Sequence, residues 1–86
     1  MNLTLHTDNA HGWLFVPNSA LHDLGLSAES FSPYSYRDDS GIYAEEDCDA
    51  TIVIKAIESA GQRLVFRSLP HEGSHWIRNL SRCGTQ

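Results

Sequence analysis

The stretch CDATIVIKAIESAG, residues 48–61, carries the clearest structural signal in the chain. Its apolar residues recur at spacings of three, four and one, which place their side chains on one face of an α-helix. That face comprises Cys48, Ile52, Val53, Ala56, Ile57 and Ala60. Asp47 is a favourable N-terminal cap, and Gly61 is of the type that ends a helix. The sequence therefore predicts an amphipathic helix that buries one face.

Five shorter segments before and after this helix have the composition of β-strands. Each alternates apolar with polar residues or is rich in aromatic and β-branched ones. The predicted strands are residues 3–7, 12–16, 34–36, 42–44 and 63–69. An Asp-Asp-Ser-Gly turn at residues 38–41 joins the third and fourth strands as a hairpin. Between the second and third strands we expect a short helix, capped by Asn18 or Ser19 and ended by Gly25.

This order of elements predicts an α+β fold. Short connections between strands favour a mostly antiparallel sheet of about five strands, with the long helix packed on one face and one short helix beside it. Beyond the last strand, Trp76, Ile77 and Leu80 stand among polar residues. Because isolated apolar side chains gain from burial, we expect this tail to pack back onto the body of the protein.

Length and composition fit one globular domain that spans residues 1–86. Hydrophobic residues make up 41% of the chain and charged residues 20%, which is typical of folded rather than disordered proteins. The first residues do not resemble a signal peptide, and no stretch approaches the ~20 apolar residues of a membrane-spanning helix. We therefore expect a cytoplasmic protein in which Cys48 and Cys83 are reduced thiols.

Charge is distributed unevenly along the chain. Residues 1–54 carry nine acidic and one basic side chain, whereas residues 55–86 carry two acidic and five basic ones. Six acids lie on the predicted hairpin turn and at the start of the long helix, so we expect them to be close in space. They are Asp38, Asp39, Glu45, Glu46, Asp47 and Asp49. Such a cluster either is a solvated helix start or docks on a basic partner.

The hairpin also carries three tyrosines, which are frequent anchors of protein interfaces, although a half-buried sheet surface is the expected role of at least one of them. They are Tyr34, Tyr36 and Tyr43. An acidic face would repel nucleic acid, so we expect no direct nucleic-acid binding through this half. The basic last third provides an alternative, a phosphate-binding surface formed by arginines, although arginines on a strand are also typical of a solvated face. These are Arg63, Arg67, Arg78 and Arg82.

One segment matches a zinc-protease motif literally. Residues 71–75 read HEGSH, and HExxH binds Zn²⁺ only when a helix brings both histidines to one face. Pro70, Gly73 and Ser74 disfavour a helix there, so we expect a polar loop. A looser metal site that uses His71, His75 and Cys83 is the alternative. The acids do not match the spacing of a calcium loop, and we expect no enzyme activity, metal or cofactor.

Several short strings resemble a family of small proteins encoded by phages, prophages and other mobile elements. They are HGWL at residues 11–14, VP at 16–17, YSY at 34–36 and, after Tyr43, EEDCD at 45–49. The resemblance covers about residues 11–60, and EEDCD is its most specific part. The last third matches weakly, chiefly in the string IRN at residues 77–79.

The resemblance implies an inhibitor of a host defence system, of the kind that anti-CRISPR proteins represent. It names no target, but an acidic protein of this size suits the basic nucleic-acid channel of a CRISPR effector subunit, in the manner of a DNA mimic. The expected activity is therefore stoichiometric binding to a host protein through the six acids and three tyrosines. The alternative is a nucleic-acid-associated accessory protein, and the oligomeric state stays open.

Overall fold

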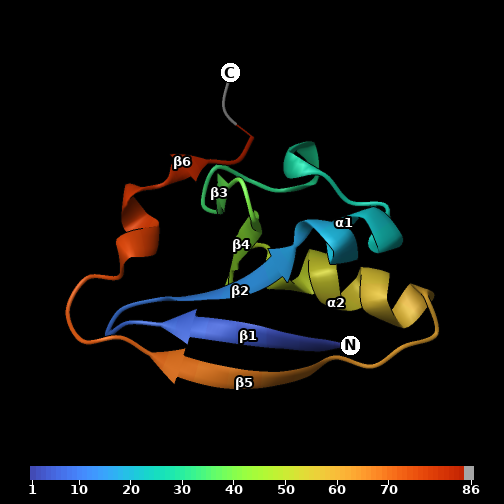
Figure 1. The fold of residues 1–86 in the computed structure, drawn as a ribbon, viewed down its shortest axis with the longest axis horizontal. Coiled ribbons are helices and arrows are strands. Elements are labelled where there is room, and N and C mark those ends of the chain that lie inside the picture. The colour runs from blue at the N-terminus through green and yellow to red at the C-terminus, as the bar shows by residue number, and fades with distance from the viewer. Residues whose placement is uncertain (85–86) are drawn as a thin grey trace.

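The fold is built on one six-stranded mixed sheet (Figure 1). The structure, a computed structural model, describes residues 1–84. The strand order across the sheet is β5-β1-β2-β4-β3-β6. The strands are β1 (Asn2–Thr7), β2 (Gly12–Pro17), β3 (Tyr36–Asp38), β4 (Gly41–Glu45), β5 (Val65–Pro70) and β6 (Ser81–Arg82). The helices are α1 (Asn18–Leu24), α2 (Ala50–Ser59) and two short 3₁₀ turns at Ala28–Ser30 and Trp76–Asn79. The expected α+β class is confirmed.

The expectation of a mostly antiparallel sheet of about five strands is met only in part, because the sheet has one parallel pair and a sixth strand. β5 pairs in parallel with β1, with Leu3 opposite Phe66. The chain reaches β5 by crossing a sheet face through α2, and such a crossover, unlike a hairpin, can place strands in parallel. The sixth strand, β6, pairs with β3 over two residue pairs, Tyr36 with Arg82 and Arg37 with Ser81. Two residues are too few to leave a periodic signal in the sequence.

The helices begin and end close to the expected positions, but their caps differ. α2 begins at Ala50 after Asp49, and Asp47 lies in the preceding turn. Neither α1 nor α2 has a side-chain N-terminal cap. The N-cap residue of α1 is Pro17, and Asn18, the first residue of the helix, donates its side-chain amide to the Asp39 carbonyl. The Asp49 carboxylate, at the N-cap of α2, accepts instead from Ser32 and Ser35. Gly25 ends α1 in the left-handed conformation, as predicted.

The main core lies between the sheet and the two helices. It joins β-strand side chains such as Leu14 and Val16 to Val53 and Ile57 of α2. Val16, Val53 and Ile57 are fully buried. Truncating any of these to alanine would remove burial and leave a cavity. Within residues 1–84, no helix has the length and apolar character needed to cross a membrane.

The opposite face of the sheet is aromatic, and the C-terminal segment covers part of it. Trp13, Tyr36 and Tyr43 form a second buried cluster there with Ile77 from the Trp76–Asn79 turn. Cys83 is also buried, although it belongs to the main core. The expectation that the tail packs back onto the body is confirmed for the described part of the tail. Thr85 and Gln86 lie outside the described residues.

Candidate functional site

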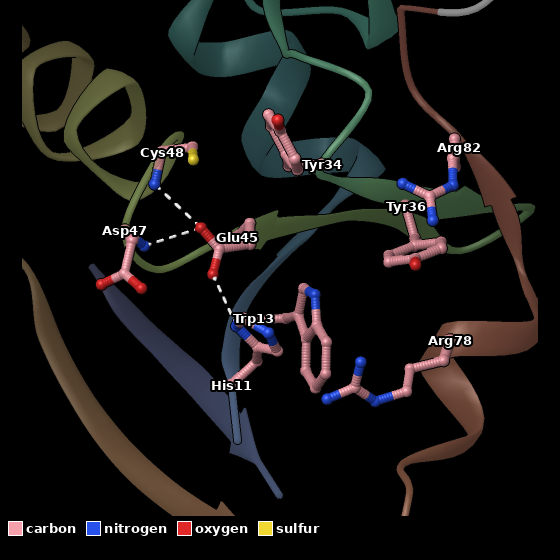
Figure 2. Close-up of a pocket in the computed structure, with 9 residues that line it drawn as sticks. All are labelled: His11, Trp13, Tyr34, Tyr36, Glu45, Asp47, Cys48, Arg78 and Arg82. Atoms are coloured by element: carbon pink, nitrogen blue, oxygen red, sulfur yellow. Dashed lines mark hydrogen bonds and ion pairs between the residues drawn. The ribbon is translucent and has the colours of Figure 1, made fainter.

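An open pocket of about 300 Å³ lies beside the ends of β2 and β4 (Figure 2). Carboxylate, imidazole, thiol, aromatic and guanidinium groups converge on it from four parts of the chain. Its lining is His11, Trp13, Tyr34, Tyr36, Glu45, Asp47, Cys48, Arg78 and Arg82. The pairing of β2 with β4 places Trp13 opposite Glu45, and this register brings the segment around His11 to the start of the turn before α2. The pocket therefore combines groups that are far apart in sequence.

Glu45 is the most constrained acid in this pocket. Glu45 is the last residue of β4, and only 6% of it is exposed. The Oε1 atom accepts hydrogen bonds from the backbone N–H groups of Asp47 (2.8 Å) and Cys48 (2.9 Å). The Oε2 atom is buried without a hydrogen-bond donor, and His11 Nδ1 lies 3.4 Å from it. One carboxylate oxygen is thus held in place while the other faces the imidazole.

The two arginines of the pocket are engaged within the protein. Arg78 forms a two-bond ion pair with Asp8, at 2.9 Å from Nε to Oδ2 and 3.2 Å from Nη2 to Oδ1, and its guanidinium lies 5.1 Å from the Trp13 ring centroid. The hydrogen bonds from Arg78 hold the pKa of Asp8 well below its usual range. Arg82 donates to the Pro33 carbonyl and lies over Tyr36. Both cations form walls of the pocket.

The six acids do not form one patch, which corrects the expectation that they lie close together. Asp38 and Asp39 lie at one end of β4 and the other four at its opposite end. The five residues of β4 span about 15 Å at the usual rise of a strand. Glu45 and Asp49 are buried, so Asp38, Asp39, Glu46 and Asp47 are the exposed acids among the six.

Tyr34 is separated from the other two tyrosines, Tyr36 and Tyr43, which pair with each other across β3 and β4. Tyr34 is 62% exposed, whereas Tyr36 and Tyr43 are buried in the second cluster. The Tyr43 hydroxyl donates to Asp38 Oδ2 at 2.9 Å. Burial is the largest cause that raises the pKa of Tyr43, and the Asp38 carboxylate is the second. Only Tyr34 of the three is therefore positioned as an interface anchor. The strand expected over residues 34–36 begins only at Tyr36, because the Ser35 N–H donates to the Ser32 carbonyl and closes a turn over residues 32–35.

Residues 71–75 lack the helix on which HExxH chemistry depends. His75 is buried, its Nδ1 atom accepts from the Ile77 N–H, and burial is the largest cause that lowers its pKa. Among residues 1–84, one group of three or more potential metal ligands lies close enough to share an ion, and it is His11, Glu45 and Asp47. The looser metal site weighed as an alternative, formed by His71, His75 and Cys83, does not come together.

The four arginines of the last third do not all gather on one surface, although Arg78 and Arg82 both line the pocket. Arg67 lies on β5 at one edge of the sheet, and Arg82 lies on β6 at the opposite edge. Arg78 is paired with Asp8. A phosphate-binding surface needs several cations along one backbone path, and this arrangement does not supply it.

The two thiols have different surroundings. Cys83 is fully buried, and desolvation raises its thiol pKa to about 11. Cys48 is exposed at the pocket and its thiol pKa is also raised, through partial desolvation and then through Glu45 and the neighbouring carboxylates. Both cysteines are free thiols, and a raised pKa suppresses the reactive thiolate.

A second candidate surface is the open edge of the sheet at β5 (Figure 1). All six residues of this strand are exposed, and Val65, Phe66 and Leu69 are 55%, 53% and 49% exposed. Beside it, an apolar cavity of about 130 Å³ lies between the strands and α2. Its lining is Leu5, Leu14, Glu46, Ala50, Ile54, Leu64 and Phe66. Large apolar side chains on an unpaired edge are typical of a binding surface.

Comparisons with protein-family models, with curated proteins and with solved structures found no match. The resemblance to mobile-element proteins therefore stays a prediction. Function has to be inferred from the chemistry of the pocket and of the β5 edge.

Sequence reasoning missed both of these features. His11 and Glu45 are 34 positions apart, and only the register of β2 against β4 brings them together. The β5 strand was expected, but its edge position depends on its pairing with β1. The one available sign was its composition, because Val65, Phe66 and Leu69 do not alternate cleanly with polar residues as they would on a half-buried strand.

Proposed function

We propose that this protein acts by stoichiometric binding to another protein, through β-strand addition at the open edge of β5. In this mode an extended segment of the partner pairs with an exposed strand, so that backbone hydrogen bonds supply affinity and side-chain pockets supply specificity. The observation that supports the proposal is that β5 is the outermost strand of the sheet and that all six of its residues are exposed.

The backbone of β5 is suited to such pairing. Successive residues of a strand direct their N–H and C=O groups alternately to its two sides. Val65 N–H donates to the Met1 carbonyl and His71 N–H to the Thr7 carbonyl, both on the β1 side. By this alternation, the N–H groups of Phe66 and Ser68 point to the open edge. Pro70 has no N–H, so the available edge ends there.

The side chains indicate the chemistry of the partner segment. On the helix side, the apolar cavity beside Phe66 would take an apolar side chain, and Glu46 at its border would attract a basic one. A second copy of this chain fits less well. An antiparallel pairing of two β5 strands that matches Phe66 of one copy with Ser68 of the other, so that their outward N–H groups are used, would place Arg67 opposite Arg67. Like charges directly opposite each other are unfavourable. We therefore expect a different protein, with an extended apolar segment that carries a basic residue.

The class of partner follows from the resemblance to mobile-element proteins. We propose a host defence protein, such as a CRISPR effector subunit, whose function is blocked by binding. A supporting contact could come from those members of the expected acidic and tyrosine face that are exposed. They are Asp38, Asp39, Glu46, Asp47 and Tyr34. Arginines on opposite edges of the sheet give no support to the alternative of a nucleic-acid-associated protein.

Ser68→Pro tests the edge directly. Proline removes the N–H that points to the open edge, and proline is tolerated on an edge strand when its nitrogen faces solvent. We expect the fold to survive while capture of the partner falls at least about tenfold, because a buried partner carbonyl loses its donor and meets the proline ring. Ser68→Ala is the matched control, since it keeps the N–H and should bind as the wild type does.

The measurement is affinity capture from lysates of cells with an active CRISPR system, followed by identification of the retained protein. Circular dichroism of each variant establishes that it is folded. A defence protein retained by the wild type and Ser68→Ala but not by Ser68→Pro supports the proposal. Equal retention by folded Ser68→Pro would rule out the β5 edge as the contact.

A further inference from the structure

One buried carboxylate oxygen in the pocket has no hydrogen-bond donor. Glu45 Oε2 is buried and accepts no hydrogen bond, although Oε1 of the same carboxylate accepts from two backbone N–H groups. Buried polar atoms are nearly always satisfied by a partner, and a bound ion is one of the explanations for an exception. Glu45 Oε2 faces His11 Nδ1 at 3.4 Å. In Figure 2 the Asp47 carboxylate lies on the same side of Glu45 as the His11 ring.

We propose that His11, Glu45 and Asp47 form a binding site for a divalent transition metal, with Zn²⁺ as the best-fitting ion. The ligand atoms of the three residues all lie within 4.8 Å of one another. Two ligands at about 2.1 Å from a tetrahedral ion are about 3.4 Å apart, which is the observed separation of His11 Nδ1 and Glu45 Oε2. Asp47 is exposed in the turn before α2, so a side-chain rotation completes the site.

The donor set selects the class of metal. One imidazole nitrogen with two carboxylate oxygens suits Zn²⁺ and its neighbours, whereas Ca²⁺ and Mg²⁺ prefer all-oxygen sites with more ligands. The backbone N–H groups of Asp47 and Cys48 orient the Glu45 ligand, as outer partners do in metal sites. Three protein ligands leave a fourth position open to the pocket, where a water or a donor group of a bound molecule would complete the tetrahedron.

The metal site is separate from the β5 contact that carries the proposed function, and it shares only Asp47 with the candidate supporting contact. It lies at the ends of β2 and β4, whereas partner binding is assigned to β5 at the sheet edge. Ser68→Pro should therefore leave metal binding unchanged, and loss of the metal ligands should leave the β5 edge intact.

Isothermal titration of the metal-stripped full chain with ZnCl₂ tests the proposal. We expect saturable binding of one Zn²⁺ per chain and no comparable binding of Mg²⁺ or Ca²⁺. His11→Ala should weaken Zn²⁺ binding at least about 100-fold, since removal of even an outer partner costs up to about that factor. His22→Ala is the matched control, because His22 is an exposed histidine on α1 away from the pocket.

Glu45→Gln provides a second variant that keeps the fold. Its amide oxygen can still accept from the Asp47 and Cys48 N–H groups, while the NH₂ group replaces the ligand oxygen. We expect it to lose Zn²⁺ binding and to remain folded by circular dichroism. The proposal is overturned if the wild type shows no saturable Zn²⁺ binding, if both pocket variants retain wild-type affinity, or if His22→Ala loses as much affinity as His11→Ala.

Discussion

Replacement of Asp8 with alanine is expected to lower the free energy of unfolding by about 3 kcal/mol, the low end for breaking a buried ion pair. The Asp8 side chain is fully buried. It accepts from two Arg78 nitrogens and from the backbone N–H groups of Ala10, His11 and His75. Asp8 therefore ties the β1–β2 turn to the C-terminal segment. Its removal leaves the guanidinium and these N–H groups without their acceptor.

Urea unfolding of wild type and variant measures this loss. Asp23→Ala is the matched control, because Asp23 is an exposed acid on α1 and surface substitutions usually change stability by less than about 0.5 kcal/mol. A loss for Asp8→Ala no larger than that for Asp23→Ala would contradict the role assigned to the ion pair.

The same pair predicts a pH dependence with a definite sign. The pKa of Asp8 is lowered in the folded state, first by Arg78. A carboxyl group with a lowered folded pKa contributes stability above its unfolded pKa, about 3.9, and loses that contribution as pH falls below it. The stability gap between wild type and Asp8→Asn should therefore narrow below about pH 4. A gap that stays constant down to pH 2 would contradict this.

Asp49→Ala is also expected to lower the free energy of unfolding by about 3 kcal/mol, but for a different reason. Asp49 is only 3% exposed. Its Oδ2 atom accepts from Ser32 N–H at 2.9 Å, from Ser32 Oγ at 2.8 Å and from Ser35 Oγ. Alanine leaves three donors in the buried region unsatisfied, and each costs on the order of 1 kcal/mol. The carboxylate thus joins the loop before β3 to the start of α2.

Thermal unfolding is the measurement for Asp49→Ala. For a chain of this size, 3 kcal/mol corresponds to a fall in Tm of roughly 15 °C. Asp47→Ala is the control, because that side chain is exposed two positions earlier and should shift Tm only slightly. Similar Tm values for the two variants would show that the Ser32–Ser35–Asp49 contacts do not stabilise the fold.

The burial of two acids limits which positions of the acidic string, residues 45–49, suit charge-reversal variants. Glu45 and Asp49 are buried and bonded within the chain, so charge reversal at either position would damage the fold before it revealed a contact. Glu46 and Asp47 are exposed and are the appropriate positions for such variants. Sequence spacing alone could not separate the two kinds of acid, because all four share the same short acidic string.

Elements with a strong local signal were predicted well. The periodic apolar face predicted α2, the aromatic run before Pro17 predicted β2, and Gly25 marked the end of α1. Each of these depends on residues close together in the chain, where spacing and turn chemistry act directly.

Features that depend on long-range pairing were not predicted. The parallel pairing of β5 with β1 and the two-residue strand β6 arise from where the chain returns after α2 and after the C-terminal turn. The burial of Tyr36 and Tyr43 follows from the position of Ile77 over the aromatic face. The contact between His11 and Glu45 likewise depends on a strand register that one sequence does not reveal.

Amide hydrogen exchange at β5, measured with and without the captured partner, tests the central claim most directly. Phe66 and Ser68 should exchange rapidly in the free protein because their N–H groups point to the open edge, while Arg67 and Leu69 are protected by β1. Bound partner should slow exchange at Phe66 and Ser68 as their N–H groups enter the added strand. Rapid exchange at both positions in the saturated complex, with new protection elsewhere, would contradict strand addition at β5.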